Sequence, residues 1–503
     1  MRAPLPILAL TAICALCRLA APFQGAPAAQ EKPAAQGAPA ARKAPAAQGA
    51  PAARKAPAAQ GAPAAQKAPA AQKAPAAQKA PAAQRKPGAL KKTAARKKPR
   101  RATIQVTAAM RAAALNRVNQ AIAASANQTL RQPGALAPVF EQLLRLGGGQ
   151  SRDPVHILHF GDSHTASDEW TGGLRDLLQQ RFGDGGSGFS VAGHPFAGYR
   201  RFDAHSGATA GWQSEGLRKA DGDGYYGLGG ISVVAWSPGQ SVSVDADCDR
   251  IEIDYLQQPG GGGVELYDGD RPIQQFSTDG ELAPAFSSYE IPAGPHHFVL
   301  RTLEAKPVRL FGWVADKDAG VTYEALGING AEAAVMLRWN QDMLTTYLQR
   351  RNPGLIVLAY GANEASDSAW DPVSYQAMYS SLLEKLRAAA PTASILAIGP
   401  GDRWARYHGV WKPVPGIDWT IAAQRAACKA NGCAFWDTRE RMGGKGSMPQ
   451  WVTAGLGQAD RVHFTDAGYH RLATALFEDL MSQYGVYQKA RTESEKEGNG
   501  PIK

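Results

Sequence analysis

Residues 155–164 read Val155-His156-Ile157-Leu158-His159-Phe160-Gly161-Asp162-Ser163-His164. The first six form a short apolar run that is typical of a buried strand, and a polar turn follows at once. A helix is predicted directly afterwards, at 168–182. The alternation returns later in the chain, with strands predicted at 355–360, 394–398 and 433–436 and helices at 372–390, 420–430 and 467–484. This pattern predicts an α/β domain whose parallel sheet carries helices on both faces.

The alternation is interrupted by a segment of different character at 231–320. Gly, Pro and Asp separate its short apolar runs, and no helical period appears between them. Many short strands with turn residues between them predict a β-sandwich. The α/β domain is therefore expected in two parts, 103–230 and 321–486, with the sandwich inserted between them. The first part includes two helices predicted within 104–147.

The chain carries a net charge of +11, but its two ends differ in charge. Residues 1–102 hold 19 Lys and Arg with one acid, Glu31, whereas the rest holds 36 basic and 43 acidic residues. Residues 22–102 repeat Ala, Pro, Gln and Lys, which predicts a disordered linker. It is either an electrostatic tether to an anionic wall or membrane, or a plain spacer. The polar segment 487–503 is also expected to be disordered, and nucleic acid is not an expected partner.

Export is indicated by the first 21 residues. Arg2 precedes an apolar run at 5–17, which is too short to span a bilayer but suits a secretory signal peptide. The protein is therefore expected to cross the inner membrane and reach the periplasm. In an oxidising compartment Cys428 and Cys433 either close a small disulfide loop or stay as buried thiols. The sequence does not decide between these two states.

Two motifs at opposite ends of the α/β domain carry candidate catalytic groups. Ser163 lies in the turn after the first strand, where a side chain projects into the crevice at the carboxyl end of the sheet. Asp460 and His463 precede the last helix, three residues apart, so one local turn can bring them together. A serine nucleophile needs a base, and the base needs a carboxylate to orient it. Taken singly, Ser163 could be a helix cap and the other two ordinary loop residues.

Two further motifs supply candidate donors for an oxyanion. Asn363 follows the buried strand at 355–360, which places its amide at the same edge of the sheet as Ser163. Gly330 follows another strand, and its N–H can approach a substrate closely because no side chain intervenes. With the Ser163 N–H, these groups would form an oxyanion hole. Alternatively, both residues only shape turns.

Together the four motifs resemble the SGNH (GDSL-like) hydrolase superfamily, whose blocks occur here in the same order over about 155–485. The resemblance implies a flavodoxin-like parallel sheet, an esterase activity and no metal or cofactor. It assigns catalysis to Ser163, Asp460 and His463, and the oxyanion hole to Ser163, Gly330 and Asn363. Two positions depart from the commonest pattern: His164 stands where many members have Leu, and Glu364 where many have Asp.

A closer resemblance comes from Gly161-Asp162-Ser163-His164-Thr165-Ala166-Ser167-Asp168 and from Arg181-Phe182-Gly183-Asp184-Gly185-Gly186. Both are similar to bacterial peptidoglycan O-acetylesterases, which carry a sandwich similar to a family-35 carbohydrate-binding module at this place. The implied substrate is the acetyl ester on the C6 oxygen of N-acetylmuramic acid.

Three alternatives stay open. A related periplasmic SGNH transferase moves acetyl onto peptidoglycan with the same triad, and other SGNH esterases act on other acetylated polysaccharides. In the third alternative the protein only binds the wall and its triad is inert. The sequence also leaves open the oligomeric state, the signal cleavage site and whether the inserted domain binds a sugar or an ion.

Overall fold

The computed structural model describes residues 105–217 and 222–496, and one of its two large sheets is mostly parallel. The strand order of this sheet is β1-β17-β14-β13-β2-β12. Its members are β1 (Leu130–Arg131), β2 (Val155–Gly161), β12 (Val321–Gly327), β13 (Leu355–Ala359), β14 (Ser394–Gly399) and β17 (Ala434–Asp437). All neighbours pair in parallel except β1, which joins β17 antiparallel. This is the doubly wound order of flavodoxin-like sheets, so the predicted fold class is confirmed.

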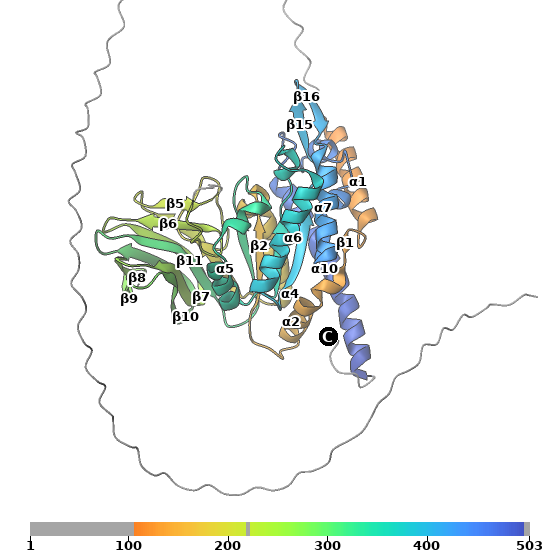
Figure 1. The fold of residues 1–503 in the computed structure, drawn as a ribbon. Helices are drawn as coiled ribbons and strands as arrows, with labels where there is room; N and C mark the ends of the chain where they lie inside the picture. The colour runs from red at the N-terminus through yellow and green to blue at the C-terminus, as the bar shows by residue number, and fades with distance from the viewer. Residues whose placement is uncertain (1–104, 218–221, 497–503) are drawn as a thin grey trace, which may run out of the picture. The chain divides into compact units, whose positions relative to one another are not determined.

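Helices cover both faces of this sheet (Figure 1). In β2, Leu158 and Phe160 enter one core, whereas Val155 and Ile157 enter the other, as expected for side chains that alternate along a strand. The first core is closed by α5 (Gln341–Arg351), α6 (Pro372–Ala389) and α7 (Gly416–Ala430). The second is closed by α1 (Ala108–Ser125), α2 (Ala137–Gly147), α4 (Glu169–Phe182), α9 (Met448–Ala454) and α10 (Asp466–Lys496). None of the helices described is long and apolar enough to cross a membrane.

The inserted segment forms one antiparallel sheet of nine strands beside the α/β domain (Figure 1). Its strands are β3 (Gly186–Val191), β4 (His205–Ala208), β5 (Gln213–Gly216), β6 (Ile231–Ala235), β7 (Ser241–Gln257), β8 (Gly263–Asp268), β9 (Arg271–Ser277), β10 (Ala283–Thr302) and β11 (Val308–Asp316). Its core contains Val244, Ile253, Phe298 and Trp313. The ends of the insertion meet at the α/β sheet, where Lys317 pairs with Asp184 at 2.6 Å.

The long strands β7 and β10 pair along most of their length and link all nine strands by hydrogen bonds. This sheet begins at residue 186, whereas the sequence predicts the inserted segment from residue 231. An alternation of apolar and polar residues does not mark its first strands, because they are short and rich in glycine. Two of these glycines, Gly186 and Gly188, have positive φ.

The structure bears on two further predictions from the sequence. Helix α10 runs to Lys496, so residues 487–496 are helical rather than disordered, since Tyr487 and Arg491 both contact Glu141 of α2. Cys428 and Cys433 are buried free thiols, which was one of the two expected states. The predictions for the signal peptide at 1–21, the linker at 22–102 and the terminal residues 497–503 lie outside the described residues.

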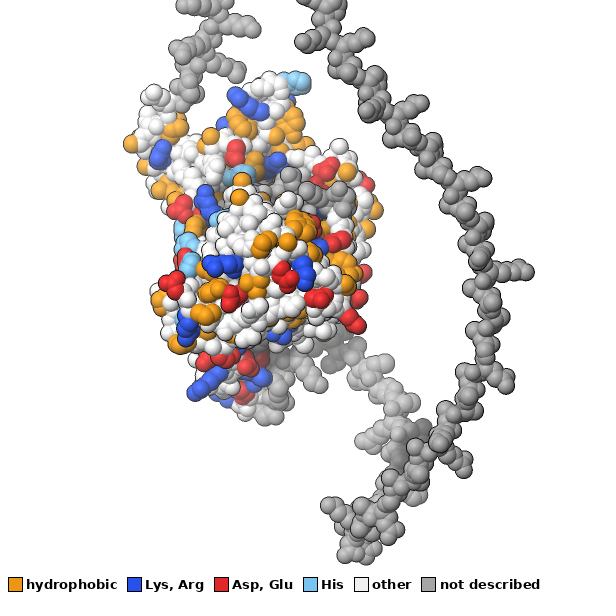
Figure 2. Space-filling view, turned by 90° about the vertical axis from the view of Figure 1, so that its left-hand side faces the viewer, with side chains coloured by type: hydrophobic (Ala, Val, Ile, Leu, Met, Phe, Trp, Pro, Cys, Tyr) orange, Lys and Arg blue, Asp and Glu red, His pale blue; other side chains and the backbone are white. Residues whose placement is uncertain are grey.

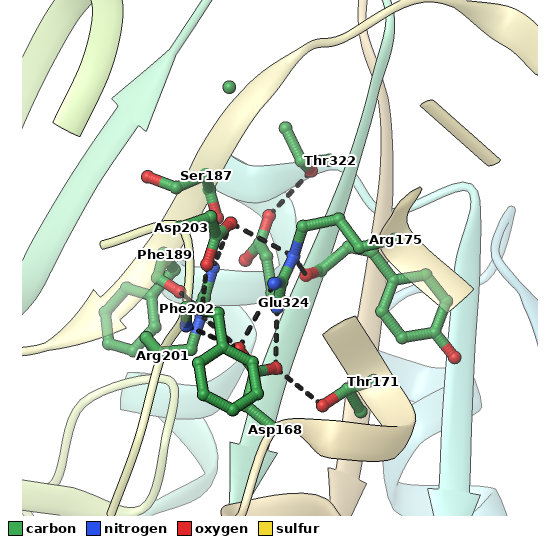
Figure 3. A network of polar contacts seen from close by, with 12 residues as sticks. Asp168, Thr171, Arg175, Ser187, Phe189, Arg201, Phe202, Asp203, Thr322 and Glu324 are labelled. Carbon is green, nitrogen blue, oxygen red and sulfur yellow. Dashed lines mark hydrogen bonds and ion pairs between the residues drawn. The ribbon is translucent and has the colours of Figure 1, made fainter. Parts of the chain in front are cut away.

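A buried ionic network joins the inserted sheet to the α/β domain (Figure 3). Asp168, just before α4, is fully buried and accepts a hydrogen bond from Arg175 at 2.7 Å. Arg201 lies 3.9 Å from the same carboxylate and also pairs with Asp203 at 3.0 Å. Burial opposes ionisation of Asp168, but the two guanidinium groups hold its pKa below the usual value.

The two arginines of this network reach strands in both sheets. Arg175 donates to the carbonyl of Tyr323 in β12 at 3.0 Å. Arg201 donates to the carbonyls of Ser187 and Phe189 in β3, each at 2.6 Å. One carboxylate therefore fixes the junction of α4, β3 and β12.

Replacing Asp168 with Ala should lower the free energy of unfolding by about 3–5 kcal/mol, because two buried cations lose their shared partner. Denaturant unfolding at neutral pH measures this. Glu169→Gln is the matched control, since the adjacent Glu169 pairs with an Arg200 side chain that is 58% exposed. The control should lose less than about 1 kcal/mol. Equal losses in the two variants would contradict the role given to Asp168.

Candidate active site

Ser163 is held at the carboxyl end of β2 by a tightly packed turn. It begins the short helix α3 (Ser163–Ala166), and the Asp162 side chain accepts the N–H of His164 at 2.9 Å. A Cβ on Gly161 would lie 2.1 Å from the hydroxyl of Thr165, so only glycine fits there. As the first residue of α3, Ser163 leaves its own N–H outside the hydrogen bonds of that helix.

The three predicted triad residues meet in a chain of hydrogen bonds. Ser163 Oγ lies 2.9 Å from His463 Nε2, and His463 Nδ1 lies 2.7 Å from Asp460 Oδ2. The other carboxylate oxygen of Asp460 accepts the backbone N–H groups of Val462 and His463. Although partial burial works against ionisation, these hydrogen bonds hold the pKa of Asp460 below its usual value. The arrangement can therefore deliver a proton from Ser163 to a histidine that a carboxylate orients.

Asn363 also lies at this edge of the sheet, in contact with the loop that contains Gly330. Its side-chain amide donates to the carbonyl of Ala331 at 2.8 Å and to Asp162 Oδ2 at 3.3 Å. Gly330 adopts a left-handed conformation, with φ +68°. Both Asn363 hydrogens thus have acceptors, and the bond to Asp162 is long. To bind an oxyanion, the Asn363 side chain would have to give up its hydrogen bond to Asp162, which is the longer of the two.

Two buried carboxyl groups support these loops. Burial raises the pKa of Asp162 to about 6 and that of Glu364 to about 8. Glu364 accepts the N–H of Gly361 at 3.0 Å and the N–H of Ala333 at 2.9 Å. It therefore ties the loop that carries Asn363 to the segment that follows Gly330. The sequence marks Glu364 as a departure from a family pattern, but this bridging role depends on tertiary contacts.

His164 packs against the candidate base. Its ring centroid lies 5.0 Å from that of His463, and its Nδ1 lies 2.9 Å from the hydroxyl of Tyr469. Burial, with the positive charges of His463 and Arg403 nearby, lowers the pKa of His164 to about 3. His164 is therefore a neutral packing partner of His463 at neutral pH.

A cavity of about 300 Å³ is lined by the inserted sheet and α5, with Glu252, Asp254 and Arg350 among its residues, and no triad residue lines it. Most of its charges are paired, as in the contact of Arg350 with Glu252 at 2.8 Å. A cavity of about 30 Å³ lies behind the triad, next to Asp162 and His164. The triad itself opens to solvent, since the His463 side chain is 33% exposed.

Comparison with known proteins assigns this arrangement to an enzyme class. Residues 301–471 match the model of the GDSL-like Lipase/Acylhydrolase family. The chain contains a GDSL-like acylhydrolase domain, and it is a carboxylic ester hydrolase. The matched range includes Gly330, Asn363, Asp460 and His463 but not Ser163, which precedes the inserted sheet in the chain.

A solved structure described as a peptidoglycan O-acetylesterase is similar to most of this chain. The two are 26% identical, with a TM-score of 0.60, over 69% of this chain and 96% of the other. A family two carbohydrate esterase from Cellvibrio japonicus is 12% identical over 56% and 98% of the two chains, with a TM-score of 0.25. The second likeness is too weak to carry an argument. No curated protein sequence matches the chain significantly.

The structure thus brings together Ser163, His463 and Asp460 and places Asn363 beside them. The sequence did not point to Arg403, which donates to the carbonyl of Ala362 next to Asn363.

Glu364→Ala should lower kcat on 4-nitrophenyl acetate about 10²-fold with little change in KM, because misplaced oxyanion donors weaken the transition state more than the ground state. Steady-state kinetics measures this, and Glu364→Asp should recover part of kcat. A variant that lost stability but kept kcat would show that Glu364 is structural only.

In the His164→Leu variant, the free energy of unfolding should fall less steeply with decreasing pH than in the wild type. The folded-state pKa of His164 is depressed, so its contribution is fully present above pH 6.5 and is lost as pH falls toward 3. Between pH 7 and pH 5, the free energy of unfolding should fall by about 1–2 kcal/mol more in the wild type than in the variant. Denaturant unfolding of both proteins at the two pH values measures the difference. Parallel losses would contradict a neutral His164.

Proposed function

We propose that this ester hydrolase removes O-acetyl groups from N-acetylmuramic acid in peptidoglycan, and that it acts in the periplasm. The observation that carries the proposal is the hydrogen-bonded chain from Ser163 through His463 to Asp460, at the carboxyl edge of the sheet. The substrate class is supported by the likeness to a peptidoglycan O-acetylesterase over two thirds of the chain.

The geometry supports a two-step acyl transfer. His463 Nε2 takes the proton of Ser163 Oγ, and that oxygen attacks the acetyl carbonyl carbon. The N–H groups of Ser163 and Gly330 and the amide of Asn363 stabilise the oxyanion. His463 then returns the proton to the sugar oxygen as the sugar C6–OH leaves, which produces acetyl-Ser163. Water, deprotonated by His463, hydrolyses this ester and releases acetate.

Hydrolysis is favoured over transfer by the openness of the site. The Asp460 side chain is 44% exposed and that of His463 33%, so water has access to the acetyl-serine. A transferase has to protect the same intermediate from water until a sugar hydroxyl arrives. Transfer is therefore the second candidate and is tested in the same experiment.

Ser163→Ala should abolish acetate release from O-acetylated peptidoglycan, with a loss of about 10³-fold or more, while the fold is retained. Enzymatic assay of free acetate and circular dichroism measure the two properties. Ser167→Ala is the matched control, since its hydroxyl lies four residues away and contacts no polar group in the described chain.

Two parallel reactions separate the alternatives. Faster release from acetylated xylan than from peptidoglycan would move the substrate to another polysaccharide. Acetylated chitooligosaccharides formed in place of free acetate would identify a transferase. Unchanged turnover in Ser163→Ala would remove Ser163 as the nucleophile.

A further inference from the structure

A two-stranded hairpin projects from the α/β domain next to the triad loop. It consists of β15 (Trp404–Tyr407) and β16 (Val410–Pro413), and it stands out at the top of the ribbon in Figure 1. His408 and Gly409 form its turn, both with positive φ, which is the geometry of a tight two-residue hairpin turn. The hairpin pairs with neither of the two large sheets, so the contacts of its side chains determine what it does.

The hairpin is clamped to the triad loop through Arg461, the residue after Asp460. The N–H of Trp404 donates to the carbonyl of Arg461 at 3.1 Å. The Arg461 guanidinium lies 5.5 Å from the ring centroid of Trp404 and 4.6 Å from that of Trp411. These are cation–π distances, so the hairpin and the loop that carries Asp460 form one unit.

Four cations gather on this unit: Arg403, Arg406, Lys412 and Arg461, here called the cationic arm. None of them forms an ion pair within the described residues. Residues 403–413 contain no acid, although acids outnumber bases over residues 103–503. Arg403 lies within electrostatic reach of Asp162 and Asp460. The exposed Arg406 and Lys412, however, have no ion-pair partner among the described residues, in contrast to the buried Arg175 and Arg351, which pair with carboxylates.

The arm also reaches the other side of the site. Arg403 donates to the carbonyl of Ala362, while its Nε is buried and has no partner in the described chain. On the face of the inserted sheet, by contrast, acidic and basic side chains are interspersed (Figure 2). The arm is therefore a positive surface without ion pairs at the rim of the candidate active site, and its arginines suit a planar anion such as a carboxylate.

We propose that the cationic arm binds carboxylate groups of the glycan strand whose ester is being cleaved. This inference rests on the proposed function. Each muramic acid carries a lactyl group on C3, which ends in a free carboxylate or in a stem peptide with carboxylates of its own. Both sources share one chemistry and lie on the same sugar ring as the C6 acetyl ester. The arm thus selects anionic glycan and holds it beside Ser163.

The test measures competition and does not require the polymer to be cleaved. Peptidoglycan strands stripped of O-acetyl groups compete with 4-nitrophenyl acetate, and the inhibition constant is determined. Three competitors are compared: strands with stem peptides, strands freed of peptides that expose the lactyl carboxylate, and strands whose carboxylates are capped as methylamides. The variant is Arg406→Gln combined with Lys412→Gln, because both side chains are exposed.

The double variant should bind the carboxylated strands about fivefold more weakly than the wild type, because two exposed charge contacts are lost. Capped strands should bind both proteins equally, and added salt should weaken wild-type binding more than that of the variant. Arg117→Gln, an exposed arginine on α1, is the matched control and should behave as wild type. A larger loss with one carboxylated strand identifies which carboxylate the arm contacts.

Equal inhibition constants for wild type and double variant would overturn the proposal, as would an equal loss with capped and uncapped strands. A failure of the proposed function is recognised by a separate result, which is that the wild type releases no acetate from peptidoglycan. The competition experiment still shows in that case whether the arm binds carboxylates.

Discussion

The parallel pairing of β2 with its two neighbours is the constraint on which the rest of the site depends. Gly161 lies opposite Gly327 on one side and Ala359 on the other, so the three strands end at the same level. Each strand is followed within four residues by a candidate site residue, which is Ser163, Gly330 or Asn363. Because parallel strands point the same way, these groups converge without any long loop. The triad then needs only Asp460 and His463, which one turn before α10 supplies.

The inserted sheet leaves this arrangement intact because it joins the α/β domain at its side. The insertion departs after α4 and returns at β12, and the network around Asp168 fixes both points. The strand edge that carries Ser163 is therefore undisturbed.

The sequence was sufficient to predict the alternation of strands and helices and that Ser163, Asp460, His463 and Asn363 lie at one edge of the sheet, because these depend on local patterns and chain order. Other features depend on contacts between distant segments. Short glycine-rich strands such as β3 gain their structure from β11, and the end of α10 is held by Glu141. The bridge made by Glu364 and the clamp on Arg461 likewise need partners that no local pattern reveals.

The contact between Lys317 and Asp184 bears on how the chain folds. Strand β2 lies between β12 and β13, so it cannot complete its pairing until residues far along the chain have emerged. The strands of the inserted sheet pair with one another and not with β2, so this sheet can form before the α/β sheet, and its closed ends bring residues 184 and 317 together. The loop that must close between β2 and β12 then becomes several-fold shorter, which lowers the entropic cost of closing it by about 1–2 kcal/mol. In this order of events the insertion acts as a folding scaffold for the strand that carries the nucleophile.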